Sequence, residues 1–230
     1  PKNLLVSVFD EEENLIEGAT INLFKGNDLV ATQKTGEEIY TEDDWSLGRY
    51  SSLSPGIDPE TFSGEVRLKD FGGFYSTSTE WLISQEIDFG TSSINYKKFS
   101  WSGNLPEGTS IKFQLASNND NSTWNFVGPD GTSNTYFETQ EFEIPSFIQN
   151  KRFLKYKVYM QTNNPLTSPS LDKIKIIFNS SCFSLGETLF QNLNPGKYLL
   201  EVIKEGYFFY SNEINISDED FYHEKIILTR

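Results

Sequence analysis

The sequence has very few of the side chains that mark redox and metal-binding proteins. Its 230 residues include one cysteine, Cys182, one histidine, His223, and one methionine. A lone cysteine cannot form a disulfide bond within the chain and does not identify a compartment. A lone histidine cannot build a zinc site from several imidazoles. The apolar runs reach only the length of a strand, so we expect no direct membrane insertion by this chain.

Basic residues are also scarce. The chain has 19 lysines and arginines against 33 aspartates and glutamates, which gives a formal net charge of −14 at pH 7. A surface of this sign repels phosphate backbones and anionic lipids, so we expect no nucleic acid as a partner and no docking on an anionic membrane. The acidity favours solubility and is compatible with calcium binding.

Helical periodicity of useful length is missing as well. Hydrophobic residues make up 37% of the chain and aromatic residues 15%, which is enough apolar area to bury a core. Short alternating runs end at Gly, Asn, Asp or Pro; in residues 153–161, for example, Tyr156, Val158 and Met160 alternate with Lys157 and Tyr159. This pattern predicts an all-β protein of the sandwich or barrel type.

The expected strands fall into three blocks. Residues 1–44 hold only about three strands, which is too few to form a sandwich alone. Residues 179–230 also have too few strands for a sandwich of their own. The block between them, residues 45–178, has enough strands for a core of its own. We therefore predict two β-sandwich domains. Residues 1–44 and 179–230 form one discontinuous domain, and residues 45–178 are inserted into it.

Three segments of the outer blocks carry a recognisable pattern: residues 15–21 (LIEGATI), 190–198 (FQNLNPGKY) and 204–207 (KEGY). They resemble the carboxypeptidase-regulatory-like family, close to the collagen-adhesin B-type repeats. The resemblance implies an immunoglobulin-like Greek-key sandwich. Some domains of this kind carry a Lys–Asn isopeptide bond with its lysine on the first strand. Because residues 4–9 contain no lysine and Lys2 lies just before them, we expect no such bond.

Residues 105–114, 118–132 and 151–158 of the middle block resemble a jelly-roll module found in bacterial surface and pilin-like proteins. The resemblance implies a jelly-roll sandwich and an extracellular, cell-surface location rather than a particular activity. This chain lacks the apolar N-terminal helix of a pilin, which argues against a pilin-subunit role unless such a helix was removed. The chain begins at Pro1 with no signal peptide, so we interpret it as a mature form or an excised fragment.

Acidic side chains gather in three turns, residues 10–13, 42–44 and 218–220. Calcium takes about six to eight oxygen ligands, usually from several loops, and no EF-hand spacing is present. A solvated acidic turn is the simpler interpretation. Structural calcium is the alternative cofactor, with Asp43, Asp44 and Asp120 as its candidate ligands, because jelly-roll modules often bind one ion.

The tryptophans are the candidates for ligand binding. Sugar rings pack against aromatic faces, so Trp45, Trp81 and Trp124 are candidates for a carbohydrate platform, with burial in the core as the alternative. Trp101 alternates with Phe99 and is expected in the core.

No catalytic residue can be assigned. His223 has no recognisable nucleophile or orienting partner and is expected at the surface. Cys182 is expected to be a packed or spare thiol. Glycosidases need two carboxyl groups that flank a cleft. Glu141 and Glu143 share a strand face, but glutamates two residues apart are also typical of an exposed edge strand.

The sequence therefore favours a non-catalytic extracellular structural or adhesive module of a cell-surface protein or pilus-like appendage. Its partners would be other surface or filament subunits, or cell-surface glycans. The alternatives are a carbohydrate-binding jelly-roll module and, less favoured, a glycoside hydrolase.

Overall fold

The computed structural model describes residues 2–46, 48–59, 64–180, 184–217 and 219–230. Nearly all its regular structure is β-strand, and the exception in this part of the chain is one turn of 3-10 helix, η1 (Ser146–Ile148). The prediction of an all-β protein is thus confirmed. No helix in the described ranges has the length and apolar character needed to span a membrane.

The chain folds as two compact units. Unit 1 combines Pro1–Glu38 with Asn179–Arg230, and unit 2 is Ile39–Phe178. The first boundary expected from the sequence, after residue 44, is therefore six residues late. Residues 39–44 belong to unit 2 because strand β4 (Glu38–Glu42) pairs with strand β14 (Ser170–Ser180). The acidic side chains of this segment suggested a junction and concealed the strand.

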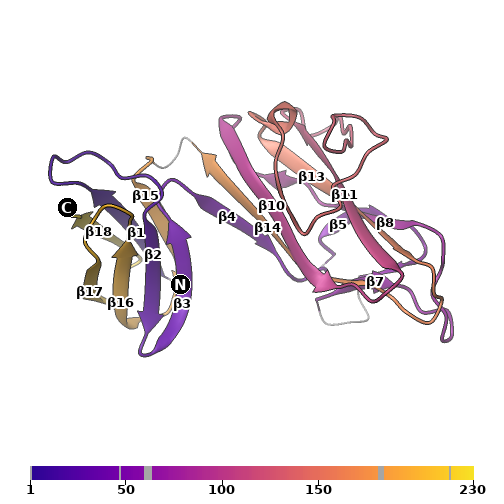
Figure 1. Cartoon of the computed structure of the whole chain (residues 1–230), viewed down its shortest axis with the longest axis horizontal. Helices are drawn as coiled ribbons and strands as arrows, with labels where there is room; N and C mark the ends of the chain where they lie inside the picture. Colours follow the sequence, from indigo (N-terminus) through magenta and orange to yellow (C-terminus); the bar gives the residue numbers. More distant parts are fainter. Residues whose placement is uncertain (1, 47, 60–63, 181–183, 218) are drawn as a thin grey trace. The chain divides into compact units, whose positions relative to one another are not determined.

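Unit 1 is a sandwich of two sheets (Figure 1). A three-stranded sheet has the order β15-β1-β18, and a four-stranded sheet the order β17-β16-β2-β3. Their bounds are β1 (Lys2–Phe9), β2 (Thr20–Lys25), β3 (Asp28–Lys34), β15 (Glu187–Leu193), β16 (Gly196–Ile203), β17 (Tyr210–Ile216) and β18 (Phe221–Ile227). The first strand, β1, pairs antiparallel with β15 and parallel with the last strand, β18. The two ends of the chain therefore meet in one sheet.

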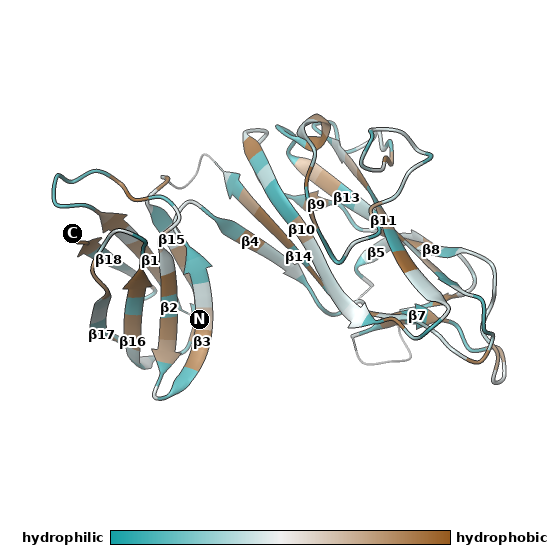
Figure 2. Ribbon diagram, viewed as in Figure 1, coloured by the Kyte–Doolittle hydropathy of each residue, from teal (hydrophilic) through white to brown (hydrophobic). Residues whose placement is uncertain are grey.

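Alternation along β1 builds the core of unit 1. Leu4, Val6 and Val8 are fully buried, and they pack in one cluster with residues from the later strands. The main partners are Ile21, Leu23, Phe190, Leu200, Val202 and Ile226. Figure 2 shows the matching hydrophobic bands on β1, β2 and β16. Burying one such side chain contributes about 1.5–3 kcal/mol to stability. Because the cluster includes residues from both ends of the chain, the two ends form a single hydrophobic interior.

Unit 2 is a larger sandwich with its own core. One sheet has the order β12-β10-β14-β7-β6 with β4 beside β14, and the other has the order β11-β13-β8-β5 with β9 beside β13. The remaining bounds are β5 (Tyr50–Leu53), β6 (Ile57–Asp58), β7 (Val66–Leu68), β8 (Glu80–Ser84), β9 (Ile87–Asp88), β10 (Ile94–Asn104), β11 (Thr109–Asn118), β12 (Glu141–Glu143) and β13 (Phe153–Thr162).

Aromatic rings fill the space between these two sheets. The ring of Phe99 on β10 lies 5.2 Å from that of Phe113 on β11 and 6.1 Å from that of Tyr156 on β13, centroid to centroid. All three side chains are fully buried. The tilted and edge-to-face angles are those that aromatic pairs prefer.

One carboxylate is buried in unit 2. Glu42, the last residue of β4, is 4% exposed. The Tyr40 hydroxyl donates to its Oε2 at 2.7 Å, and Nη1 of Arg49 lies 3.4 Å from its Oε1. Burial raises the pKa of Glu42, and the hydrogen bond from Tyr40 and the charge of Arg49 offset only part of this effect.

This buried acid makes the stability of unit 2 depend on pH. Folding raises the pKa of this carboxyl above its ordinary value of 4.5, so the folded state favours the protonated form. The stabilising contribution of the group is therefore present at low pH and is lost as the pH rises from 4.5 through the raised pKa. A Glu42→Gln substitution should remove that loss, because the amide stays neutral and still accepts from Tyr40. We expect the variant to gain about 1 kcal/mol on the wild type between pH 4 and pH 8.

Urea unfolding followed by tryptophan fluorescence measures this effect, since all four tryptophans lie in unit 2. Glu143→Gln, at an exposed carboxylate of β12, is the matched control and should follow the wild-type profile. Parallel pH profiles for wild type and Glu42→Gln would show that Glu42 carries no such penalty.

Candidate functional site

The carboxylate of Asp120 shapes a turn. Its Oδ1 accepts hydrogen bonds from the backbone N–H groups of Ser122 and Thr123, each at 3.0 Å, and its Oδ2 accepts from the Thr123 hydroxyl at 3.0 Å. The backbone hydrogen bonds from Thr123 and Ser122 lower the pKa of Asp120 to about 2. Aspartates in loops commonly satisfy backbone groups in this way.

The other two calcium candidates also have local partners. Asp44 accepts from the backbone N–H of Ser46 at 3.0 Å, and Oδ2 of Asp43 lies 3.6 Å from the ammonium of Lys173. Across the described ranges, no group of three His, Cys, Asp or Glu side chains is placed to hold a metal ion. The structure therefore does not gather Asp43, Asp44 and Asp120 into a ligand set. Asp218 of the third acidic turn lies outside the described residues.

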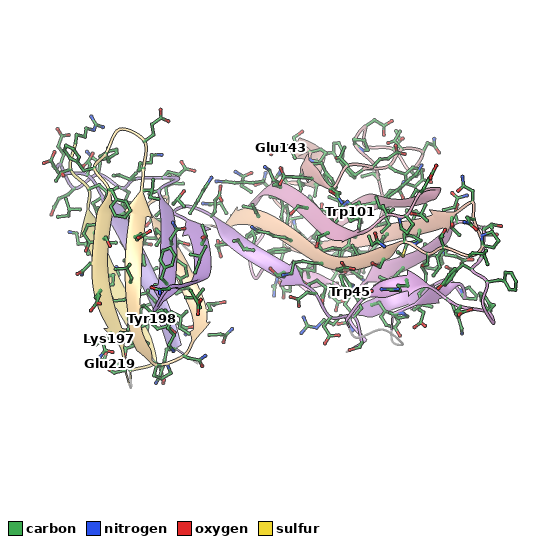
Figure 3. The ribbon with its side chains drawn as sticks, turned by 60° about the horizontal axis from the view of Figure 1, so that its bottom comes forward. Trp45, Trp101, Glu143, Lys197, Tyr198 and Glu219 are labelled. Carbon is green, nitrogen blue, oxygen red and sulfur yellow. The ribbon has the colours of Figure 1, made fainter. Side chains whose placement is uncertain are left out.

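Trp45 does not belong to a binding platform, which corrects one expectation. Its side chain is fully buried, and its Nε1 donates to the Tyr156 hydroxyl at 2.8 Å. Trp101 is 5% exposed and donates from Nε1 to the carbonyl of Thr139 at 3.0 Å, as expected for a core residue. Figure 3 labels both indoles, which lie within unit 2. Neither ring can offer a face to a ligand.

Trp81 and Trp124 keep partial exposure, and both lie under lysines of β13. The ammonium of Lys157 is 4.5 Å from the ring centre of Trp81, and that of Lys155 is 4.8 Å from the ring centre of Trp124. Such contacts contribute about 0.5–2 kcal/mol. The platform expected from the tryptophans is thus a surface of alternating lysines and aromatic rings.

Strand register explains how this surface forms. Val158 and Met160 of β13 point into the core, so Lys157 and Tyr159 point outward. Tyr159 lies opposite Trp81 of β8 on one side and Lys112 of β11 on the other. The lysine–aromatic face is the set of outward side chains Trp81, Lys112, Trp124, Tyr136, Lys155, Lys157 and Tyr159.

The loop after β11 adds Tyr136 to this face. The loop covers the free edge of β11 through isolated bridges from Phe137 to Phe113 and from Val127 to Leu115. The buried amide of Gln114 donates to the carbonyls of Ser133 and Thr135, each at 2.9 Å, and so fixes the loop next to the sheet.

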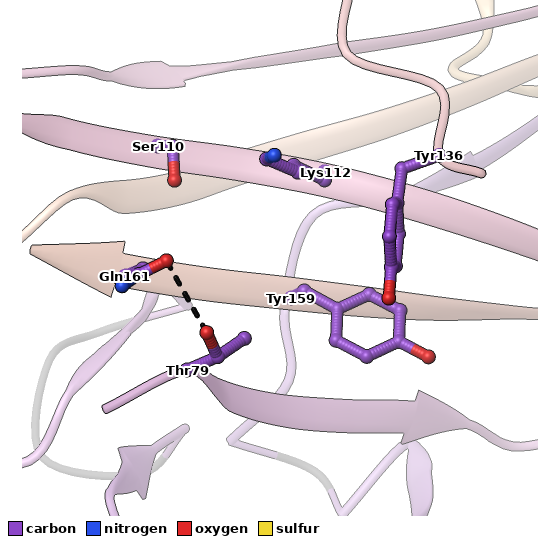
Figure 4. A pocket seen from close by; sticks show the side chains of 6 residues that line it. All are labelled: Thr79, Ser110, Lys112, Tyr136, Tyr159 and Gln161. Carbon is purple, nitrogen blue, oxygen red and sulfur yellow. Dashed lines mark hydrogen bonds between the residues drawn. The ribbon is translucent and has the colours of Figure 1, made fainter. Parts of the chain in front are cut away.

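Tyr136 and Tyr159 form one wall of a small hollow. Their rings are 5.0 Å apart at 85° to each other. The hollow holds about 110 Å³ and is lined by Thr79, Ser110, Lys112, Tyr136, Tyr159 and Gln161 (Figure 4). The Tyr159 hydroxyl donates to Oε1 of Gln114 at 2.8 Å, and burial raises its pKa to about 12. This phenol therefore stays neutral at ordinary pH.

His223 is exposed, as expected, but it has a partner. Its Nε2 lies 2.8 Å from Oγ of Ser7, and Ser7 donates to Oε1 of Glu187 at 3.0 Å. In a catalytic triad the carboxylate orients the histidine, whereas here it contacts the serine. Ser7 is also only 1% exposed. This arrangement holds β1 to its two neighbours and does not present a nucleophile.

The remaining candidates lie at strand ends and edges. Glu141 pairs with Lys98 at 2.9 Å, on the edge strand β12. The ammonium of Lys2 lies 3.1 Å from Oδ1 of Asp220. Cys182 falls outside the described residues.

Comparisons with known proteins give no family. No family model and no curated protein matches the sequence. Among solved structures, a variant of the major pilin subunit of Bacillus cereus is 10% identical over 100% of this chain and 99% of its own, with a TM-score of 0.23. The shaft pilin of Lactobacillus rhamnosus GG (10% identity, 99% of this chain and 97% of its own) scores 0.15.

The adhesin domain of Epf from Streptococcus pyogenes is 10% identical over 93% of this chain and 96% of its own, with a TM-score of 0.19. Each comparison is a distant similarity. Scores of this size do not establish a common fold.

Proposed function

We propose that the chain is a non-catalytic structural module of a cell-surface protein or pilus-like appendage. In this module, unit 1 carries mechanical tension and unit 2 is displayed from it. Its partners would be neighbouring subunits or domains joined at the ends of unit 1. The observation that carries the proposal is the parallel pairing of β1 with β18, from Asn3 opposite Phe221 to Phe9 opposite Ile227.

This pairing sets how the module responds to pulling. In a parallel pair, the start of β1 and the end of β18 lie at opposite ends of the ladder, as the chain ends in Figure 1 illustrate for unit 1. Tension between the two chain ends therefore loads the whole ladder in shear, with the inter-strand bonds sharing the force. The antiparallel contact of β1 with β15 anchors the same strand from its other side.

Insertion keeps unit 2 off the path of the force. The chain leaves unit 1 after Glu38 and returns at Asn179, while β1 and β18 contact each other directly. As long as unit 1 is folded, tension crosses the β1–β18 ladder and bypasses residues 39–178. Such a topology suits a domain that must remain folded while its support is under load.

Pulling single molecules by the two chain ends should therefore unfold unit 1 first. Unit 2 should follow as a separate step that releases roughly 460–500 Å, the extended length of residues 39–178. Force spectroscopy measures both the order and the lengths of the steps. A step of that length appearing before any other would contradict the proposal.

A change of pulling geometry is the matched control. With Cys182 replaced by Ser, a handle on Glu219→Cys places the force beside the start of β1, because Asn3 lies opposite Phe221. The ladder then opens bond by bond, so unit 1 should yield at a several-fold lower force than when it is pulled from Arg230. Equal forces in the two geometries would show that the β1–β18 ladder does not bear the load.

A second candidate function is carbohydrate binding by unit 2. The lysine–aromatic face supports it, since partly exposed rings beside hydrogen-bonding groups suit the apolar faces and hydroxyls of sugars. A hydrolase receives no comparable support, because Glu141 and Glu143 lie on an edge strand and Glu141 is engaged by Lys98.

Glycan-array binding tests this second function. Trp81→Ala should lower binding about tenfold, because it removes the one aromatic ring that β8 contributes to the face. Phe74→Ala is the control, as Phe74 is an aromatic residue of unit 2 that is 57% exposed and lies outside the face. Absence of any glycan signal for the wild type, or equal losses in both variants, would argue against carbohydrate binding here.

A further inference from the structure

We infer that the lysine–aromatic face selects saccharides that carry a carboxylate, with the carboxylate seated in the hollow beside Lys112. The inference rests on the proposed carbohydrate binding and names its ligand class. Three observations carry it: the charge of the face, the hydrogen-bonding groups of the hollow and the size of the hollow.

The face is cationic on a strongly acidic chain. Lys112 and Lys157 are partly exposed on it although the chain's net charge is −14, whereas Lys155 is only 8% exposed and lies against Trp124. Lys112 pairs with Glu138 at 2.8 Å and Lys155 with Glu86 at 3.7 Å. Lys157 has no carboxylate partner among the described residues and lies over the rings of Trp81 and Tyr159. Lys157 does not line the hollow, so its unmatched charge would attract an anionic ligand to the face, while the Lys112 ammonium would hold the carboxylate in the hollow.

The hollow offers donors that suit an anion. The Thr79 hydroxyl donates to Oε1 of Gln161 at 3.2 Å, the bond drawn in Figure 4. Within the described part of the chain, the amide nitrogen of Gln161 and the hydroxyl of Ser110 have no hydrogen-bond partner. Together with the ammonium of Lys112, these groups match the acceptor oxygens of a carboxylate.

The volume sets how much of a ligand enters. Pockets that enclose a whole small molecule measure about 300–1,000 Å³, whereas this hollow holds about 110 Å³. One carboxylate or hydroxymethyl group fits, while the sugar ring that carries it lies outside. A sugar ring extending from the hollow towards Trp81, opposite Tyr159 on the neighbouring strand, would have to displace the Lys157 ammonium that lies over the Trp81 ring.

The pair between Lys112 and Glu138 makes the inference specific. A bound carboxylate must compete with Glu138, whose side chain is 61% exposed, for the same ammonium. Removing the charge of Glu138 should therefore strengthen binding, whereas removing that of Lys112 should weaken it. A nearly identical pair, Lys98 with Glu141 at 2.9 Å, lies on the opposite sheet and provides matched controls.

Isothermal titration of the full chain with trigalacturonate and with its methyl ester tests the inference, because the two probes differ in charge at the carboxyl groups. We expect trigalacturonate to bind about tenfold more tightly than the ester at low salt. Lys112→Gln should abolish that preference and Glu138→Gln should increase it several-fold. Lys98→Gln and Glu141→Gln should match the wild type, and thermal melts confirm that each variant folds.

The possible results distinguish a failure of the carboxylate selectivity from a failure of carbohydrate binding as a whole. If the ester binds as tightly as the acid and Trp81→Ala weakens both, carbohydrate binding stands and the carboxylate selectivity is wrong. If neither probe binds and glycan arrays are also negative, both are wrong, while the mechanical role of unit 1 is unaffected. An equal loss in Lys112→Gln and Lys98→Gln would show that binding follows overall charge, which also overturns the inference.

Discussion

The fold of unit 1 depends on one strand, β1, held between β15 and β18. Its inward side chains Leu4, Val6 and Val8 are fully buried among residues from both segments of unit 1, including those that follow the inserted unit in sequence. On its other face, Ser7 links Glu187 of β15 to His223 of β18. Without this strand the three-stranded sheet would lose its centre. The parallel ladder that supports the mechanical proposal would also be lost.

Much of the architecture was accessible from the sequence, because alternation and turn residues are local signals. The run 153–161 predicted β13 (Phe153–Thr162), and the shortage of strands in each outer block argued that they fold together. The segment 39–44 was misassigned because its acidic side chains suggested a solvent-exposed junction. Pairing of β4 with β14 is a long-range contact, which local pattern does not reveal.

The candidate site was only partly predictable, for a related reason. Trp81 and Trp124 were singled out as aromatic residues, but the lysines above them follow from strand register. Trp45 stands next to an acidic turn in sequence, yet its indole is buried against the Tyr156 hydroxyl. Tyr136 comes from a polar loop without periodicity, and its position depends on the amide of Gln114. The alternation of Lys155, Lys157 and Tyr159 was the signal that could have located the face.

The central claim is that the two ends of the chain form one cooperative interior, distinct from that of unit 2. Native-state amide hydrogen exchange on a Val6→Ala variant tests it most directly, since truncating a buried aliphatic side chain leaves a cavity that weakens its whole cooperative unit. The account predicts reduced protection throughout β1, β15, β16 and β18, with β10 and β14 unchanged. Unchanged protection in β15 and β18, or an equal loss in β10 and β14, would contradict it.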